Sequence, residues 1–227
     1  TDGVDIVIGG ADADTIATGD GNDIVLGDNG FVTFDHHTVT GEKVSVLGEI
    51  ASTDTNIGGI DEIIVGQGND VVIAGGGGDR VNYTLDAADQ PVKVNDGDTG
   101  VDVVIGDNGR ATFETTTGVA VIAFIETIAP EDGGDDLIFV DNGNDIVLAG
   151  SGNDVVDAEN ETNPDDGVDI VFGDNGTVTF DLVGTGAGLA PVLATVVSTA
   201  TGIGGDDVIL VGEGDDLVVA GPGNDLV

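Results

Sequence analysis

Short apolar runs alternate with runs rich in glycine and aspartate along most of the chain, and they recur every nine residues. The pattern is plainest at 65–82, 140–157 and 211–227, which read VGQGNDVVIAGGGGDRVN, VDNGNDIVLAGSGNDVVD and VGEGDDLVVAGPGNDLV. We number each unit so that its aspartate is position 6, and position 8 is then Val or Ile in every unit. The position-6 aspartates are Asp5, Asp14, Asp23, Asp61, Asp70, Asp79, Asp102, Asp136, Asp145, Asp154, Asp169, Asp207, Asp216 and Asp225.

Each unit predicts a turn followed by a short strand. Position 4, and often position 2, is usually glycine, as at Gly66 and Gly68 before Asp70. Glycine adopts backbone conformations that other residues avoid, and β-branched residues favour strands. Positions 7 and 9 are mostly apolar as well, for example Val71 and Ile73. Because a strand with two apolar faces is buried on both, we expect the outer face of the repeat structure to be covered.

Three segments between the repeats are candidates for this cover. Each follows a GDNG sequence, at 27–30, 106–109 or 173–176, and begins with FVTFD, RATFE or TVTFD. After a turn, a second β-rich run follows at 43–53, 119–128 or 191–201. This arrangement predicts β-hairpins that pack on the repeat strands or extend them. Block and hairpin recur together, and Asp61 and Asp207 occupy equivalent places two such super-repeats apart.

The expected organisation is four repeat blocks separated by three hairpins. The repeat blocks are 1–30, 56–109 with a linker at 83–99, 132–176 and 203–227, and the hairpins are 31–55, 110–131 and 177–202. The chain begins and ends inside a repeat, so we expect it to be a fragment of a longer array.

The unit resembles the RTX (haemolysin-type) calcium-binding repeat, GGxGxDxUx. The resemblance implies an all-β fold, a parallel β-roll or β-helix solenoid, here interrupted by β-hairpin insertions. It also implies two units per coil, with Ca²⁺ between turns stacked on the same side. That geometry needs aspartates separated by two whole units, and the pairs Asp5/Asp23, Asp61/Asp79, Asp136/Asp154 and Asp207/Asp225 satisfy it.

The family pattern also implies the ligands. Carbonyl oxygens at positions 2 and 4 of one turn would join those at positions 1 and 3 of the next, together with both position-6 aspartates. The first expected site uses Gly3, Asp5, Thr18, Asp20 and Asp23. The others use Ile57, Gly59, Asp61, Ala74, Gly76 and Asp79, then Asp132, Gly134, Asp136, Ala149, Ser151 and Asp154, then Ile203, Gly205, Asp207, Ala220, Pro222 and Asp225. Calcium suits such irregular sets of oxygen ligands.

The GDNG turns depart from the pattern, because position 6 is not an aspartate there. Asp28, Asp107 and Asp174 instead place a carboxylate at position 2, and we expect each to substitute for the missing ligand. An Asn-Gly turn that merely leads into the hairpin is the open alternative. In the linker, Asp96 and Asp98 either add a ligand or solvate the loop, and solvation is the interpretation we favour.

Composition supports a cation as the partner. There are 44 acidic residues against 4 basic ones, a formal charge of -40, yet 40% of residues are hydrophobic. A disordered acidic tail would be poor in Val and Ile, so the charge must be neutralised in a folded state. The strong negative charge also excludes nucleic acid and anionic membranes as partners, because both would be repelled. Cysteine is absent, which leaves a hard ion bound by oxygen, and no apolar run is long enough for membrane insertion.

Other functions find little support in the sequence. His36 and His37 are the only histidines, and we expect an exposed pair in the first hairpin turn. No GxSxG, HExxH or phosphate-loop motif occurs, so no catalytic residues and no enzyme activity are predicted. Ice binding lacks a threonine ladder at position 3. The recurrent position-5 asparagines, such as Asn22 and Asn69, are expected to stabilise turns.

The predicted function is a structural module that binds several Ca²⁺ ions and folds on binding them. Its partners are calcium and the neighbouring repeats of the same chain. The resemblance implies an extracellular or cell-surface location reached by type I secretion. We favour a rigid stalk or spacer of a large surface adhesin, with a surface-layer component or the secretion module of a toxin or enzyme as alternatives.

Overall fold

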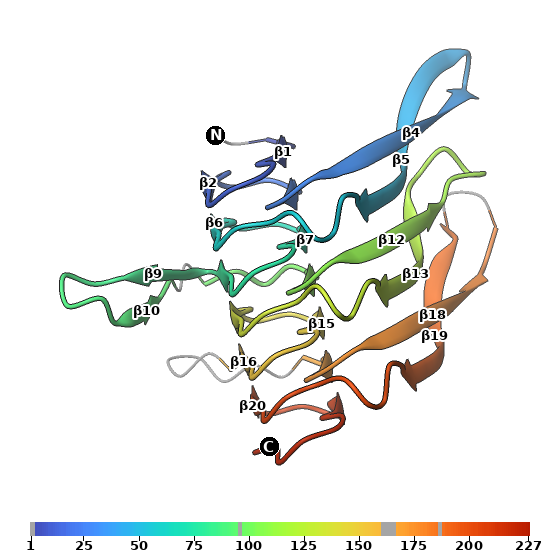
Figure 1. Ribbon diagram of the computed structural model, residues 1–227. Coiled ribbons are helices and arrows are strands. Elements are labelled where there is room, and N and C mark those ends of the chain that lie inside the picture. The colour runs from blue at the N-terminus through green and yellow to red at the C-terminus, as the bar shows by residue number, and fades with distance from the viewer. Residues whose placement is uncertain (1–2, 95–96, 160–166, 186–187) are drawn as a thin grey trace.

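The computed structural model describes residues 3–94, 97–159, 167–185 and 188–227. In this part of the chain, the repeats wind into one roll made of two parallel sheets (Figure 1). Sheet A contains, in spatial order, β1 (Ile6–Ile8), β3 (Ile24–Leu26), β7 (Val71–Ile73), β11 (Val103–Ile105), β15 (Ile146–Leu148), β17 (Ile170–Phe172) and β21 (Leu217–Val219). Sheet B contains β2 (Thr15–Ala17), β6 (Glu62–Ile64), β8 (Arg80–Val81), β14 (Leu137–Phe139), β16 (Val155–Ala158) and β20 (Val208–Val211).

Each of these strands begins directly after a position-6 aspartate. Successive repeat strands alternate between the two sheets, so two units make one coil and the predicted β-roll is confirmed. Parallel strands lie about 4.8 Å apart. The seven described strands of sheet A therefore extend about 29 Å along the roll axis.

The interior of the roll is filled by the position-8 side chains of both sheets. Val25, Val72 and Val147 from sheet A meet Ile63 and Ile138 from sheet B, and all five are fully buried. The space between the sheets is filled by one such side chain from each strand, together with position-1 side chains such as Ala74 and Val140. This packing explains why position 8 is β-branched and apolar in every unit.

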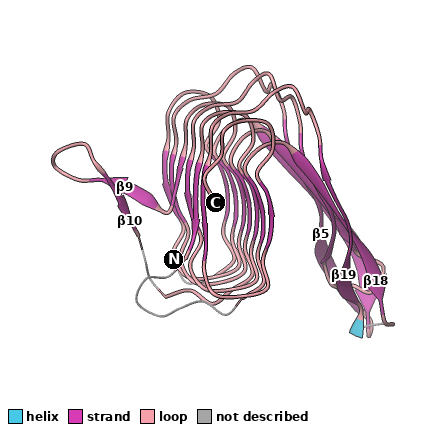
Figure 2. Ribbon diagram, turned by 90° about the horizontal axis from the view of Figure 1, so that it is seen from below, coloured by secondary structure: helices cyan, strands magenta, loops and turns pink. Residues whose placement is uncertain are grey.

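The three predicted hairpins join into one antiparallel sheet, which we call the cover sheet. Figure 2, seen along the roll, shows it lying beside one wall of the roll. Its inner row, which includes Ile50, Ala111 and Ile125, packs on position-7 and position-9 side chains of sheet A such as Leu148 and Phe172. The expected cover is thus confirmed for sheet A. The described strands are, in spatial order, β4 (Gly30–Val39), β5 (Glu42–Ser52), β12 (Gly109–Glu114), β13 (Val121–Thr127), β18 (Gly176–Val183) and β19 (Ala190–Ser198).

The cover sheet stays in step with the roll because of where the hairpins are inserted. Each hairpin follows a strand of sheet A, namely β3, β11 or β17, and one strand of that sheet separates consecutive insertions. Two hairpin strands therefore accompany two strands of sheet A. Strand spacing is the same in both sheets, so successive hairpins pair edge to edge without a gap.

The outer face of sheet B is different, and the expectation that the whole outside is covered was wrong there. Its position-7 row begins with Thr15, Glu62 and Arg80 before it becomes apolar. The segment 83–99, expected as a linker, contains a separate hairpin of β9 (Tyr83–Leu85) and β10 (Pro91–Lys93). This arm projects from the sheet B side in Figure 1.

The histidines lie elsewhere than expected. His36 and His37 are residues of strand β4, while the hairpin turn is at Thr40 and Gly41. The Nδ1 atom of His36 lies 3.1 Å from the Oγ atom of Ser45 on the partner strand. In the described ranges, no helix is long and apolar enough to cross a membrane.

Candidate metal centre

The position-6 aspartates form two ladders, one along the turns before sheet A and one along the turns before sheet B. In each ladder the backbone N–H of one aspartate donates to Oδ1 of the aspartate in the next coil, at 2.7–3.1 Å. The A ladder is Asp5, Asp23, Asp70, Asp102, Asp145, Asp169 and Asp216. The B ladder is Asp14, Asp61, Asp79, Asp136, Asp154, Asp207 and Asp225.

The four pairs expected from the two-unit spacing are neighbours in these ladders. The remaining neighbours are joined across insertions, so their separation in sequence varies. Asp79 and Asp136, for example, are 57 residues apart. The ladders therefore run through all four repeat blocks without a break.

In the described part of the chain, the second carboxylate oxygen of several ladder residues accepts no hydrogen bond. Oδ1 is used by the ladder bond, whereas Oδ2 points into the turn and is shielded from solvent. Buried oxygens without a hydrogen bond cost free energy, which a bound cation would remove. Among the described residues, the buried Oδ2 atoms that accept no hydrogen bond include those of Asp14, Asp23, Asp61, Asp79, Asp136, Asp154 and Asp207.

Backbone carbonyls converge on the same Oδ2 atoms. A Cβ placed on Gly27 would lie 2.3 Å from both Ala74 O and Asp61 Oδ2. The same arrangement recurs at Gly106, with Ala149 O and Asp136 Oδ2, and at Gly173, with Ala220 O and Asp207 Oδ2. In three of the four expected sites, the structure thus brings the position-1 carbonyl and the position-6 carboxylate together.

Position 4 is glycine in every unit except that of Asp14, where it is Asp12, because stacked turns approach one another there. A Cβ on Gly77 would lie 1.8 Å from the carbonyl oxygen of Gly59, and one on Gly152 would lie 2.0 Å from that of Gly134. Both glycines have φ of 146°, which other residues rarely adopt. The position-4 carbonyls expected as ligands, Gly59, Gly134 and Gly205, therefore face the next turn of the stack.

The position-5 side chains support the turns from outside. The backbone N–H of Asn69 donates to Oδ1 of Asn22 at 3.0 Å, and that of Val101 donates to Oδ1 of Asn69 at 2.7 Å. These bonds link successive turns of the A ladder, as expected for turn stabilisation.

The GDNG sequences are first halves of turns that the hairpins split. The position-6 aspartate is not missing, as the sequence suggested, but follows the hairpin: Asp61 closes the turn that Asp28 opens. Asp28 Oδ1 accepts from Gly59 N at 3.2 Å in the returning half, and Oδ2 accepts from Gly76 N at 2.7 Å in the next coil. Asp28 is 4% exposed, so it lies inside the stack beside the B ladder.

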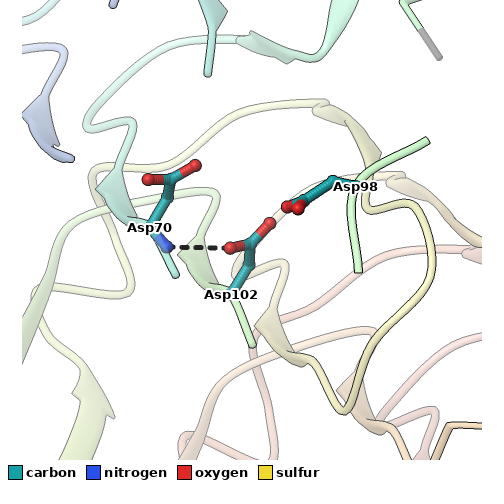
Figure 3. A group of neighbouring side chains, drawn as sticks. All are labelled: Asp70, Asp98 and Asp102. Carbon is teal, nitrogen blue, oxygen red and sulfur yellow. Dashed lines mark hydrogen bonds between the residues drawn. The ribbon is translucent and has the colours of Figure 1, made fainter. Parts of the chain in front are cut away.

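Asp98 is buried, which corrects the expectation that it solvates the linker. It is 8% exposed, and its Oδ1 accepts from the backbone N–H groups of Gly68 and Thr99 at 3.1 and 2.7 Å. One carboxylate oxygen each from Asp98, Asp70 and Asp102 lies within 4.8 Å of the others (Figure 3). The sequence did contain a signal for Asp98, because it occupies position 2 of the unit whose position-6 aspartate is Asp102. Asp96 lies outside the described residues.

Burial and mutual repulsion raise the pKa values of several carboxyls in the ladders, among them those of Asp102, Asp136 and Asp154. Desolvation, followed by the charge of Asp145, raises the pKa of Asp102 to about 9. Desolvation also raises the pKa of Asp154 to about 8, with Asp207 and Asp174 contributing. The pKa of Asp136 is well above its ordinary value, chiefly through burial. Such a stack disfavours the ionised form at neutral pH unless positive charge is supplied.

The donor set fits calcium. It consists of carboxylate and carbonyl oxygens arranged irregularly between stacked turns, which hard divalent cations prefer and Ca²⁺ tolerates. The described part of the chain offers no nitrogen or sulfur ligand at either ladder.

Comparison with known proteins agrees with this geometry. The family model of the RTX calcium-binding nonapeptide repeat matches four times, at residues 1–33, 57–86, 132–161 and 201–227, together more than half of the chain. The chain belongs to the RTX calcium-binding nonapeptide repeat family. Its repeats bind Ca²⁺, and the chain is a calcium-binding repeat module. Comparisons with curated proteins and with solved structures gave no match.

The four RTX matches correspond to stretches in which consecutive units follow without an insertion. Asp98 and Asp102 lie between the matches, as do Asp107 and Asp169. The structure nevertheless places Asp102 and Asp169 in the A ladder of the same RTX roll.

Proposed function

We propose that this RTX module folds only when calcium binds its two aspartate ladders, and that it does so outside the cell. The observation that carries the proposal is the row of buried Oδ2 atoms that accept no hydrogen bond within the described residues. With 44 acidic residues against 4 basic ones, the chain cannot neutralise them itself. Binding energy would then be folding energy, as in small metal-dependent domains. Extracellular calcium is sufficient for modules that bind at about 10⁻⁴–10⁻³ M.

The proposed ligands are the position-6 aspartates and the carbonyls named from the sequence. At the B ladder, the convergence of Ala74 O and Asp61 Oδ2 beside Gly27 supports this choice. At the A ladder, Asp98 joins the proposed set because of its place beside Asp70 and Asp102. Ile57 has weaker support, because its carbonyl already accepts from Asn29 Nδ2 at 3.5 Å.

We further propose that the folded module is a rigid stalk or spacer of a larger secreted surface protein. One roll and one cover sheet run the length of the described chain, so bending would have to break three sheets at once. Stacked repeats grow along one axis, and each added coil would extend the rod by about 4.8 Å.

The test is a calcium titration followed by calorimetry and circular dichroism on the same sample. We expect a largely unstructured chain in chelator and a cooperative gain of β-structure as several ions bind. Each coil added to the calcium-loaded chain should lengthen the particle by about 4.8 Å along the roll axis, which small-angle scattering of chains with different numbers of coils would measure. A chain that keeps its β-signal and thermal stability in chelator would contradict calcium-dependent folding.

A further inference from the structure

The three split turns of the B ladder look alike but differ at one atom. Asp28, Asp107 and Asp174 each occupy position 2 of a split turn, and each is buried. In all three, Oδ1 accepts a backbone N–H from the half of the turn that returns after the hairpin. The donors are Gly59, Gly134 and Gly205, at 3.2, 2.9 and 3.1 Å. These carboxylates therefore hold the two halves of each split turn together.

The second carboxylate oxygen, Oδ2, distinguishes Asp174 from Asp28 and Asp107. Oδ2 of Asp28 accepts from Gly76 N, and Oδ2 of Asp107 accepts from Ser151 N. Gly76 and Ser151 are position 3 of the following turn. The equivalent residue beyond Asp174 is Pro222, which has no N–H to donate. Within the described residues, Oδ2 of Asp174 is accordingly buried without a hydrogen bond.

Other oxygens lie close to this atom. Asp174 directly follows Gly173, beside which Asp207 Oδ2 and Ala220 O converge. Oδ2 of Asp207 is also buried and accepts no hydrogen bond among the residues described. Asp174 is 1% exposed, so water cannot readily satisfy its free oxygen. A divalent cation could satisfy both carboxylates.

We propose that Asp174 ligates calcium directly through Oδ2. Asp28 and Asp107 instead hold the turns together, because both of their carboxylate oxygens accept hydrogen bonds from backbone N–H groups. Pro222 thus sets the difference by withholding one hydrogen-bond donor. The inference rests on the proposed calcium-dependent folding and deepens it, because it makes one split turn a carboxylate-rich calcium site. The ion there would have one more protein carboxylate than its counterparts at Asp28 and Asp107.

The first test compares Asp174→Asn with the matched variants Asp28→Asn and Asp107→Asn by calcium calorimetry. We expect Asp174→Asn to lose one ion or to weaken one site by more than about tenfold, the lower end of the cost of losing an outer-shell partner. The two control variants should keep the wild-type number of ions. Because folding is coupled to binding, their lower folded stability should weaken the apparent affinity of all sites alike rather than of one site. Equal ion numbers and affinities in all three variants would overturn the proposal.

The second test moves the hydrogen-bond donor instead of the carboxylate. Pro222→Ser supplies an N–H to Oδ2 of Asp174, so binding at this site should weaken towards that at the other split turns. Ser151→Pro removes the donor from Asp107, and relative to Ser151→Ala it should gain calcium affinity. Unchanged binding in both exchanges would overturn the proposal. Circular dichroism of the wild type distinguishes failure of this inference from failure of the proposed function. A wild-type chain that folds without calcium would contradict the proposed function.

Discussion

The two outer faces of the roll differ although the same nine-residue repeat builds both. On sheet A, the position-9 residue Leu148 is fully buried under the cover sheet. On sheet B, the position-9 residue Leu210 is 41% exposed. The repeat itself determines the turns, the ladders and the interior, which are common to both sheets. The fate of the outer positions is decided by the insertions. The three hairpins of the cover sheet all follow strands of sheet A, whereas the β9–β10 arm follows β8 of sheet B.

Without calcium the module should unfold, so both faces and the difference between them should disappear. Lowering the pH should restore the fold. The folded pKa values of Asp102 and Asp154, about 9 and 8, exceed the unfolded value of about 3.9. The folded chain therefore binds more protons between these limits, and its stability rises as pH falls. Without calcium, we expect little β-structure at pH 8 and a clear gain at pH 5, measured by circular dichroism.

The control for this prediction is the same series in saturating calcium. Protons compete with the ion for the carboxylates. In saturating calcium, stability should therefore decrease as pH falls, which is opposite to the calcium-free trend. A calcium-free chain with equal β-content at pH 5 and pH 8 would show that the ladder carboxyls do not limit folding.

The next largest effect should come from truncating the matched leucines. Leu148→Ala removes a fully buried side chain between sheet A and the cover sheet, and should cost about 2–5 kcal/mol. Leu210→Ala, at the same repeat position on sheet B, should cost less than about 1 kcal/mol. Urea unfolding at one fixed calcium concentration measures both. Similar losses would mean that sheet B is also covered in solution.

The difference between the faces was visible in the sequence only in part. Position 8 and the aspartate pairs two units apart could be predicted because a turn and its strand are local, and because stacked neighbours within a block have a constant spacing. The split turns could not, since a whole hairpin separates Asp28 from Asp61 and neither half alone shows that it is incomplete.

The choice of sheet was also present in the pattern but needed the alternation of units. Strands before a GDNG sequence, such as β3 and β17, are apolar throughout, whereas Glu62 and Arg80 belong to the alternate units. Asp98 was misjudged because its partner Asp70 belongs to an earlier coil and the β9–β10 arm lies between them in sequence.

The arm provides a smaller test, because it covers a limited part of sheet B. Lys93 of β10 forms an ion pair with Asp157, which is 4% exposed, and its Nζ lies 5.2 Å from the ring centroid of Phe139. Tyr83 of β9 packs edge-on against the same ring at 6.4 Å. Lys93→Met keeps the apolar stem but removes the charge, and should cost about 1–3 kcal/mol.

The double variant Lys93→Met/Asp157→Asn is the matched control for the arm. If the loss comes from an uncompensated buried carboxylate, the second change should recover part of the stability in urea unfolding. Additive losses would assign the effect of Lys93 to packing instead.

The smallest effect on stability should come from making sheet B resemble sheet A. Glu62 and Arg80 are cross-strand neighbours, with 3.8 Å between Oε2 and Nε, and such partly exposed pairs contribute about 0–1 kcal/mol. Replacing both with Val should therefore change the urea midpoint little. The same change extends the apolar row that begins at Leu137, with no cover sheet to bury it, so sedimentation should show self-association. A monomeric, equally soluble double variant would mean that apolar outer positions alone do not require a cover.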